Sequence, residues 1–130
     1  MALNVGATFV ARAFVGNSTQ LVSLMEQAIS HPGFAVIDIL QPCVSFNHTN
    51  TYQWYQQRVK PIEEMEGYDP GNLEKALTFA GLWGEQIPIG LYYQTLRPTF
   101  QDSLPQLSHQ PLAQQKIDNI DITGLMQKLY

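Results

Sequence analysis

Cysteine and charge are both scarce in this 130-residue chain. Cys43 is the only cysteine, and charged residues make up 14% of the sequence. A single thiol excludes an internal disulfide, and without a Cys-x-x-Cys pair the chain lacks most of the ligands of a cysteine metal site. The low charged fraction suggests that a partner covers part of the surface, because the buried centres of interfaces are depleted in charged residues.

Several catalytic motifs are also missing. The sequence contains no glycine-rich phosphate loop, no Gly-x-Ser-x-Gly and no His-Glu-x-x-His. Asp38 lies within an expected strand and is interpreted as a structural hydrogen-bond acceptor rather than a general base. His31 precedes Pro32 at an expected helix end, where an imidazolium would complement the helix dipole. His48 follows Cys43 closely enough for a Cys/His pair to be one alternative. The chain alone therefore presents no predicted catalytic residue.

Charge and hydropathy argue against nucleic-acid and membrane partners. The net charge is −4 with a pI near 5.1, and the seven basic residues are scattered along the chain. No run of 18 apolar residues occurs. The amino terminus shows no basic segment followed by an apolar run, so we expect a cytoplasmic location.

The residue pattern of the first 40 residues predicts a strand, a helix and a second strand. Thr8–Arg12 favours a strand, and apolar residues then recur at helical spacing from Ser18 to Ile29. Phe34–Leu40 is apolar on both faces except for Asp38, as in a strand covered by helices. We therefore expect an α/β fold with a mostly parallel sheet flanked by helices.

Two more helices and a last strand are predicted further on. A helix capped by Thr49 or Asn50 is expected to carry Tyr52, Tyr55, Val59 and Ile62, and Pro61 is expected to kink or end it near Lys60. Its aromatic residues are interpreted as packing residues. Asn72 is expected to begin a helix through Ala80 and as far as Trp83, and Pro88–Tyr93 favours a strand.

Composition changes after Pro98, which gives the expected domain boundary. Residues 1–98 form the predicted α/β domain, and residues 99–130 form an extended tail rich in Gln, Ser and Pro. A final apolar pattern suggests a short helix from Thr123 to Tyr130. The pattern begins before that helix and consists of Ile117, Ile120, Ile122, Leu125, Met126 and Leu129. We expect these apolar residues to pack either on a neighbouring subunit or on their own domain.

Cys43 has two interpretations from its position alone. It follows the Phe34–Leu40 strand directly, and open α/β sheets bind ligands beyond the carboxyl ends of their strands. Free cysteine is also often a small buried apolar residue. Position in the sequence leaves both interpretations open.

Four ordered segments together resemble the β subunit of 2-oxoacid:ferredoxin oxidoreductases. They are Val5–Arg12, Gly33–Asn47, Asn50–Tyr55 and Ile87–Tyr92. The similarity begins at the first residues, which look like the middle of that subunit. The resemblance implies that the chain is the carboxyl-terminal half of a thiamine diphosphate-binding domain. In the family, the other half carries a Gly-Asp-Gly-Asp motif and most cluster cysteines.

The resemblance implies the oxidative decarboxylation of a 2-oxoacid to acyl-coenzyme A, with electrons passing through a 4Fe-4S cluster to ferredoxin. The cofactors implied are thiamine diphosphate, Mg²⁺ and the cluster. Cys43 occupies the position of the fourth cluster ligand, with Ser45 where threonine is common. Backbone amides of Val44 and Ser45 are implied donors to cluster sulfurs.

The implied partners are the amino-terminal half of the β subunit, an α subunit and ferredoxin, with the 2-oxoacid and coenzyme A as substrates of the complex. We expect the isolated chain to bind none of the cofactors and to be inactive. The alternative from a different functional class is a noncatalytic α/β interaction module derived from the same fold.

Overall fold

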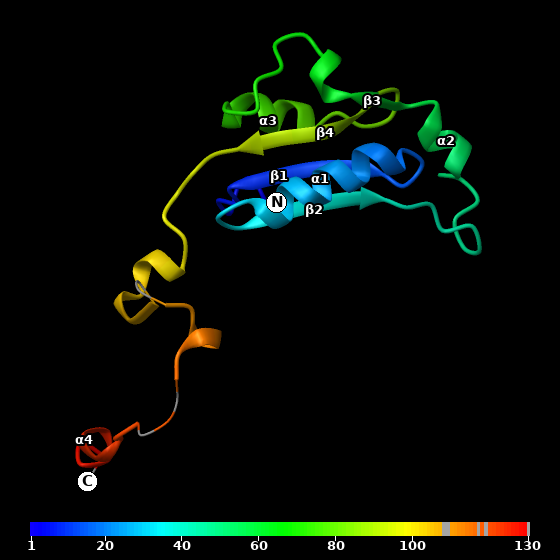
Figure 1. Cartoon of the computed structure of the whole chain (residues 1–130). Helices are drawn as coiled ribbons and strands as arrows, with labels where there is room; N and C mark the ends of the chain where they lie inside the picture. The colour runs from blue at the N-terminus through cyan, green and yellow to red at the C-terminus, as the bar shows by residue number, and fades with distance from the viewer. Residues whose placement is uncertain (108–109, 117, 119, 130) are drawn as a thin grey trace. The chain divides into compact units, whose positions relative to one another are not determined.

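The computed structural model describes residues 1–107, 110–116, 118 and 120–129, and the chain divides into two compact units. The first unit is Met1–Thr99, and it contains the sheet and the longer helices (Figure 1). The second unit is Phe100–Tyr130. In the described part of the chain, no helix combines the length and hydropathy needed to cross a membrane.

The first unit is built on a four-stranded sheet in the order β2-β1-β4-β3, with strands β1 (Phe9–Phe14), β2 (Ala35–Leu40), β3 (Val59–Pro61) and β4 (Ile87–Gln94). Strand β1 pairs in parallel with β2, and β3 pairs in parallel with β4, whereas β1 and β4 are antiparallel. Two of the three pairings are thus parallel. The predicted α/β fold, with a strand–helix–strand unit at its start, is confirmed.

Helix α1 (Ser18–Ser30) covers one face of the sheet and connects β1 to β2. The Asn17 side chain caps its start by accepting a hydrogen bond from the Gln20 amide at 3.2 Å. Its buried residue Leu24 packs against Phe9, Ala11 and Ala13 of β1. Leu21 and Ala28 also pack against this cluster, so this part of the apolar spacing faces the sheet as the sequence predicted. Met25 and Ile29, which belong to the same spacing, are exposed.

His31 ends α1 and contributes to the packing between α1 and the sheet. Its Nε2 atom lies 2.8 Å from the Thr8 hydroxyl, which also accepts a hydrogen bond from the Phe34 amide at 3.1 Å. The imidazole is buried and its centroid lies 5.5 Å from that of Phe9. These contacts fix the entry into β2.

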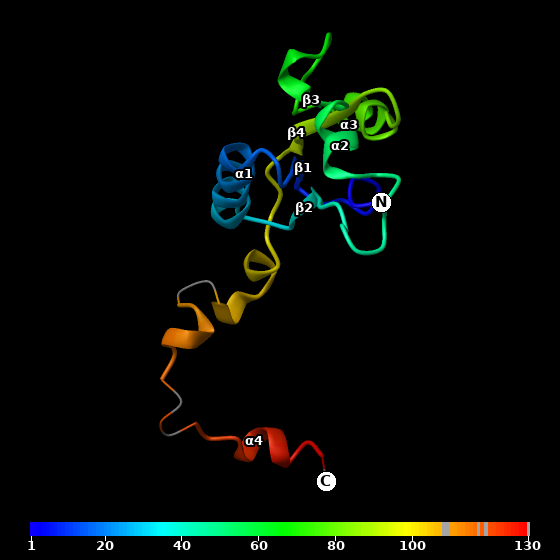
Figure 2. The same cartoon turned by 90° about the vertical axis from the view of Figure 1, so that its right-hand side faces the viewer.

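Two further clusters of buried residues pack beside elements that lie on the side of the sheet away from α1 (Figure 2). Helix α3 (Leu73–Ala80) starts at the Asn72 side-chain cap, and its Ala76 is buried with the 3₁₀ turn Ile62–Glu64 against β4. Near helix α2 (Tyr52–Gln56), Trp54 and Tyr55 pack on a cluster of strand residues, namely Phe14, Leu40, Ile87 and Ile89. Trp54 and Tyr55 are packing residues, as predicted. Tyr52 is 43% exposed, although its ring contacts that of Phe14.

The helix expected to run from Thr49 or Asn50 to near Pro61 is much shorter in the structure. Helix α2 ends at Gln56, and Val59–Pro61 is strand β3. Val59 pairs with Ile87 and Pro61 with Ile89, so pairing with a distant strand overrides local helical spacing. The third predicted helix ends at Ala80, which leaves Trp83 in the following loop.

Within its described residues, the second unit contains the 3₁₀ turns Gln101–Ser103, Pro105–Leu107 and Leu112–Gln114, followed by helix α4 (Thr123–Met126). The terminal helix is thus shorter than the expected Thr123–Tyr130. Of the apolar positions predicted there, Ile117 lies outside the described residues. Ile120, Ile122 and Leu125 are exposed.

Candidate functional site

Cys43 lies in a turn that directly follows the carboxyl end of β2. Its carbonyl accepts a hydrogen bond from the Asn47 amide at 3.0 Å. The Asn47 side chain in turn accepts from the amides of Thr49 and Asn50, at 3.0 and 2.9 Å. Cys43 is a free, exposed cysteine, so it is not the small buried apolar residue that was the alternative interpretation.

The backbone of this turn acts on the Cys43 sulfur. Hydrogen bonding by the Phe46 amide, then by the Ser45 and Asn47 amides, holds the pKa of the Cys43 thiol below its ordinary value of 9.0. A lowered pKa enriches the thiolate, which is the form that binds metals. Ser45 is thus one of the amides directed at this sulfur, and the role of Val44 stays a prediction.

The Cys43 turn holds one thiol, so a metal bound there would need further ligands from elsewhere. Among the residues that the structure describes, no three His, Cys, Asp or Glu side chains lie close enough to hold a metal ion. A 4Fe-4S cluster is normally held by four cysteine thiolates. Cys43 therefore fits one ligand position, and a second polypeptide segment would have to supply the others.

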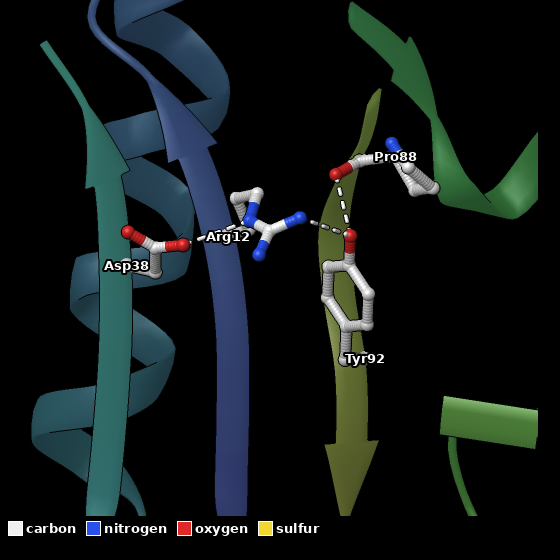
Figure 3. A network of polar contacts seen from close by, with 4 residues as sticks. All are labelled: Arg12, Asp38, Pro88 and Tyr92. Atoms are coloured by element: carbon white, nitrogen blue, oxygen red, sulfur yellow. Dashed lines mark hydrogen bonds and ion pairs between the residues drawn. The ribbon is translucent and has the colours of Figure 1, made fainter. Parts of the chain in front are cut away.

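A polar network crosses three strands on the sheet face that lies opposite α1 (Figure 3). The Arg12 Nε atom donates to Asp38 Oδ2 at 2.8 Å, between the paired positions of β1 and β2. The Arg12 Nη1 atom donates to the Tyr92 hydroxyl at 3.2 Å, and that hydroxyl donates to the Pro88 carbonyl at 2.7 Å. The interpretation of Asp38 as a structural acceptor is confirmed.

Aromatic rings enclose the Arg12 side chain. Its guanidinium lies 5.5 Å from the centroid of Trp83 and 5.4 Å from that of Tyr92. Burial of the Tyr92 hydroxyl raises its pKa to about 12, against the opposing effect of the Arg12 charge. Arg12 was not predicted as a site residue, although Arg12 and Asp38 were the only charged residues in the two expected strands.

Beside this network is a cavity of ≈ 50 Å³, lined by Arg12, Asp38 and Tyr92 together with Leu3, Val10, Ala11 and Ala80. This volume suits one or two water molecules and is far below the several hundred Å³ typical of a ligand pocket. We therefore interpret the network as a structural connection between β2, β1 and β4 rather than a substrate site. The Cys43 turn, with its exposed thiol, is therefore the candidate functional site.

Residues 43–109 match the family described as the C-terminal region of the pyruvate ferredoxin oxidoreductase beta subunit. The matched region begins at Cys43 itself. The chain belongs to the 2-oxoacid:ferredoxin oxidoreductase β subunits. It corresponds to their carboxyl-terminal part, as the sequence resemblance implied.

Known β subunits of these oxidoreductases are similar over most of the chain. The 2-oxoacid:ferredoxin oxidoreductase subunit beta of Sulfolobus sp. is 34% identical over 114 residues, which is 80% of this chain and 37% of that subunit. The subunit beta of 2-oxoacid:ferredoxin oxidoreductase 2 from Aeropyrum pernix is 35% identical over 117 residues, or 82% and 38%. The chain thus spans less than two-fifths of the length of these relatives.

A solved oxidoreductase of this kind has the same architecture. It is the 2-oxoglutarate:ferredoxin oxidoreductase from Magnetococcus marinus with 2-oxoglutarate, coenzyme A and succinyl-CoA bound. The TM-score is 0.77 at 30% sequence identity, covering 98% of this chain and 42% of that one. The fold shared by the β subunits therefore extends over nearly the whole chain.

Proposed function

We propose that this chain acts as the carboxyl-terminal part of a complex that oxidises a 2-oxoacid to acyl-coenzyme A with loss of CO₂. Electrons then pass through a 4Fe-4S cluster to ferredoxin. The proposal is supported by membership of the β-subunit family and by the Magnetococcus marinus enzyme, which holds 2-oxoglutarate, coenzyme A and succinyl-CoA. An α subunit and the unmatched part of a β subunit are the proposed partners.

The exposed Cys43 turn is the observation that carries the proposal. Its thiol has a pKa lowered by the amides of Phe46, Ser45 and Asn47, and it projects from the carboxyl end of β2. These amides would also donate to cluster sulfurs, which favours the more reduced charge state of a cluster. Cys43 is accordingly proposed as one of four thiolate ligands.

The described residues do not by themselves fit thiamine diphosphate and Mg²⁺. Mg²⁺ in such sites prefers carboxylate and other oxygen ligands, and the Asp38 carboxylate near the end of β2 is already paired with Arg12. When bound, the cofactor supplies an electron sink for decarboxylation. We therefore propose that the chain alone neither holds this cofactor nor oxidises a 2-oxoacid.

The test combines this chain with the unmatched part of the Sulfolobus sp. β subunit and its α subunit. Cys43→Ala should reduce the bound iron and the visible cluster absorption, and it should abolish ferredoxin reduction. His48→Ala is the matched control from the same loop and should retain the cluster. Unchanged iron in Cys43→Ala would overturn the ligand assignment. A fully assembled complex without 2-oxoacid oxidation would favour the noncatalytic interaction module.

A further inference from the structure

Acidic side chains are absent from a long segment that includes the Cys43 turn. Residues 39–62 contain Arg58 and Lys60 and no Asp or Glu. All eleven acidic residues of the chain lie elsewhere, together with the other five of its seven basic residues. The segment is therefore positive in a chain that is otherwise negative, and it would attract partners of negative charge.

This segment lies at the same edge of the sheet as Cys43. Trp54 and Tyr55 of α2 pack against the cluster that contains Leu40, the last residue of β2. Cys43 follows Leu40 by three positions. The exposed amide side chains of α2 and its carboxyl cap are Gln53, Gln56 and Gln57. A molecule that approaches the Cys43 turn at this edge would therefore also meet an uncharged side of α2 and the Arg58 that follows it.

The Arg58 side chain is held in place by α2. Its guanidinium carbon lies 4.5 Å from the centroid of the Trp54 ring, and its Nη1 atom donates to the Trp54 carbonyl at 3.1 Å. The Trp54 ring in turn makes an edge contact with Tyr55, with the centroids 5.0 Å apart. An arginine fixed in this way loses little conformational entropy when it binds a partner.

The charge of Arg58 has no acidic counterpart among the described residues. Asp38 pairs with Arg12, but no Asp or Glu oxygen lies within 4.0 Å of an Arg58 nitrogen, including that of Glu85 just before β4. No Arg58 nitrogen is buried without a partner, so those other than Nη1 reach solvent. A guanidinium presents a planar set of donors that matches a carboxylate. Arg58 is thus ready to bind a carboxylate from another molecule.

We propose that Arg58 and the exposed side of α2 form a docking surface for ferredoxin, and that Arg58 binds a carboxylate on the acidic surface of that protein. This inference rests on the proposed function, in which a cluster at Cys43 passes electrons to the carrier. The carrier has to approach the cluster, and this positive segment lies at the edge of the sheet that holds Cys43. Encounters between electron-transfer proteins are weak and bury little surface, so one positioned cation beside an uncharged helix is sufficient.

Kinetics of ferredoxin reduction test the role of Arg58 in the assembled complex of this chain, the unmatched part of the Sulfolobus sp. β subunit and its α subunit. With a ferredoxin of negative net charge, Arg58→Gln should raise the KM for ferredoxin about tenfold and change kcat by less than about twofold. An unchanged KM overturns the proposal. Failure of Arg58→Gln to assemble would assign the carboxylate to a neighbouring subunit and also overturns it.

Lys60→Gln is the matched control, because it removes one positive charge two positions further along the chain. Lys60 lines a depression together with Glu64 and Glu66, which already offset its charge. The KM for ferredoxin should therefore rise by less than about twofold. Equal effects of Arg58→Gln and Lys60→Gln would show that net charge alone acts, which contradicts a specific contact. Added salt should raise the KM of the unaltered complex more than that of Arg58→Gln.

Methyl viologen separates this inference from the proposed function, because a small electron acceptor needs no docking surface for a protein. Viologen reduction with an unchanged ferredoxin KM in Arg58→Gln would support the proposed function and refute the docking surface. An equal loss of viologen and ferredoxin reduction would place the effect of Arg58 on the cluster and likewise overturns docking. Absence of reduction of either acceptor by the unaltered complex would refute the proposed function.

Docking can also be measured on the full 130-residue chain without a cluster. Its two tryptophans each lie against an arginine, Trp54 against Arg58 and Trp83 against the ion-paired Arg12. When the same ferredoxin is added, the indole N–H signal of Trp54 in ¹H–¹⁵N spectra should shift or broaden more than that of Trp83. Arg58→Gln should remove this difference. An unresponsive Trp54, or the same response in Arg58→Gln, overturns the proposal whether or not the complex oxidises a 2-oxoacid.

Discussion

The Nε atom of Arg12 donates to the Asp38 carboxylate at 2.8 Å, across the parallel pairing of β1 and β2. The two side chains differ in environment, because Arg12 is 15% exposed and Asp38 is 54% exposed. Water can solvate the Asp38 carboxylate, whereas the charge of the largely buried Arg12 relies more on the ion pair for compensation. Removal of Asp38 leaves a largely buried cation with the Tyr92 hydroxyl as its remaining hydrogen-bond partner in the network.

We expect Asp38→Ala to lower the free energy of unfolding by about 1 kcal/mol, the usual scale of a partly exposed charged hydrogen bond. Urea denaturation measures this change. Glu66→Ala, at an exposed position outside the network, is the control and should change stability by less than about 0.5 kcal/mol. Equal effects of the two substitutions would show that the Arg12–Asp38 contact contributes nothing to folding.

Tyr92 should make stability fall at high pH. Its pKa is raised to about 12 from an ordinary value of 10.0, so folding favours the neutral phenol. The resulting stabilisation is complete below pH 10 and is lost as the pH rises from 10 towards 12. Tyr92→Phe should show a smaller decrease in unfolding free energy over this interval than the unaltered chain.

Tyr92→Phe should also lower the free energy of unfolding by about 1–2 kcal/mol at neutral pH, because the Pro88 carbonyl loses its buried hydrogen-bond donor. Tyr52→Phe, in which the ring is partly exposed, is the control for loss of a hydroxyl. Identical pH profiles for Tyr92→Phe and the unaltered chain would contradict the assignment of the raised pKa to Tyr92.

The first half of the fold was predictable because local signals agreed there. The helical spacing of apolar residues from Ser18 to Ile29 indicated α1, and the Phe34–Leu40 run, apolar on both faces, indicated β2. Strand β3 was not predictable, because its three residues pair with Ile87–Ile89 much later in the chain. Local spacing at Val59 and Ile62 favoured a helix that the tertiary pairing overrides.

The candidate site was predictable only in part. The position of Cys43 after β2 followed from the strand pattern. The directions of the Phe46 and Asn47 amides depend on the turn geometry, which the sequence does not encode in a recognisable motif. Arg12 was missed because its partner Tyr92 belongs to a strand that pairs antiparallel with β1, and this pairing had no local signal.

Cys43 should react with iodoacetamide at a lower pH in the folded chain than in the unfolded chain. The amides of Phe46, Ser45 and Asn47 that lower its pKa are held in place only by the folded turn. The rate of alkylation measured against pH, with and without urea, gives the two thiol pKa values without background from other cysteines. Coincident profiles would rule out an effect of the turn.

Gly33→Ala should destabilise the chain by about 2 kcal/mol or more. The φ of Gly33 is +147°, and an added Cβ would collide with the Thr8 hydroxyl and lie 3.1 Å from His31 Nε2. Gly67→Ala provides the matched control, since Gly67 also has a positive φ of +78° but has no atom within 4 Å of an added Cβ. Thermal melts should show a clearly larger shift for Gly33→Ala, and equal shifts would exclude the steric contribution.

Deletion of residues 100–130 should leave a cooperative unfolding transition with a stability change below about 1 kcal/mol. Among the residues that the structure describes, the clusters of buried apolar residues lie within Met1–Thr99. Circular dichroism of the shortened chain during heating measures this. Loss of the cooperative transition would mean that the second unit belongs to the core of the first.

The sheet order also determines when the molecule can fold. Central strand β1 is the first strand in the sequence and β4 is the last, and Arg12 and Tyr92 are separated by 80 positions. Such distant pairing slows folding, because a long loop must close before its contacts form. During synthesis, the side of β1 that pairs with β4 therefore stays unpaired until Ile87–Gln94 has left the ribosome.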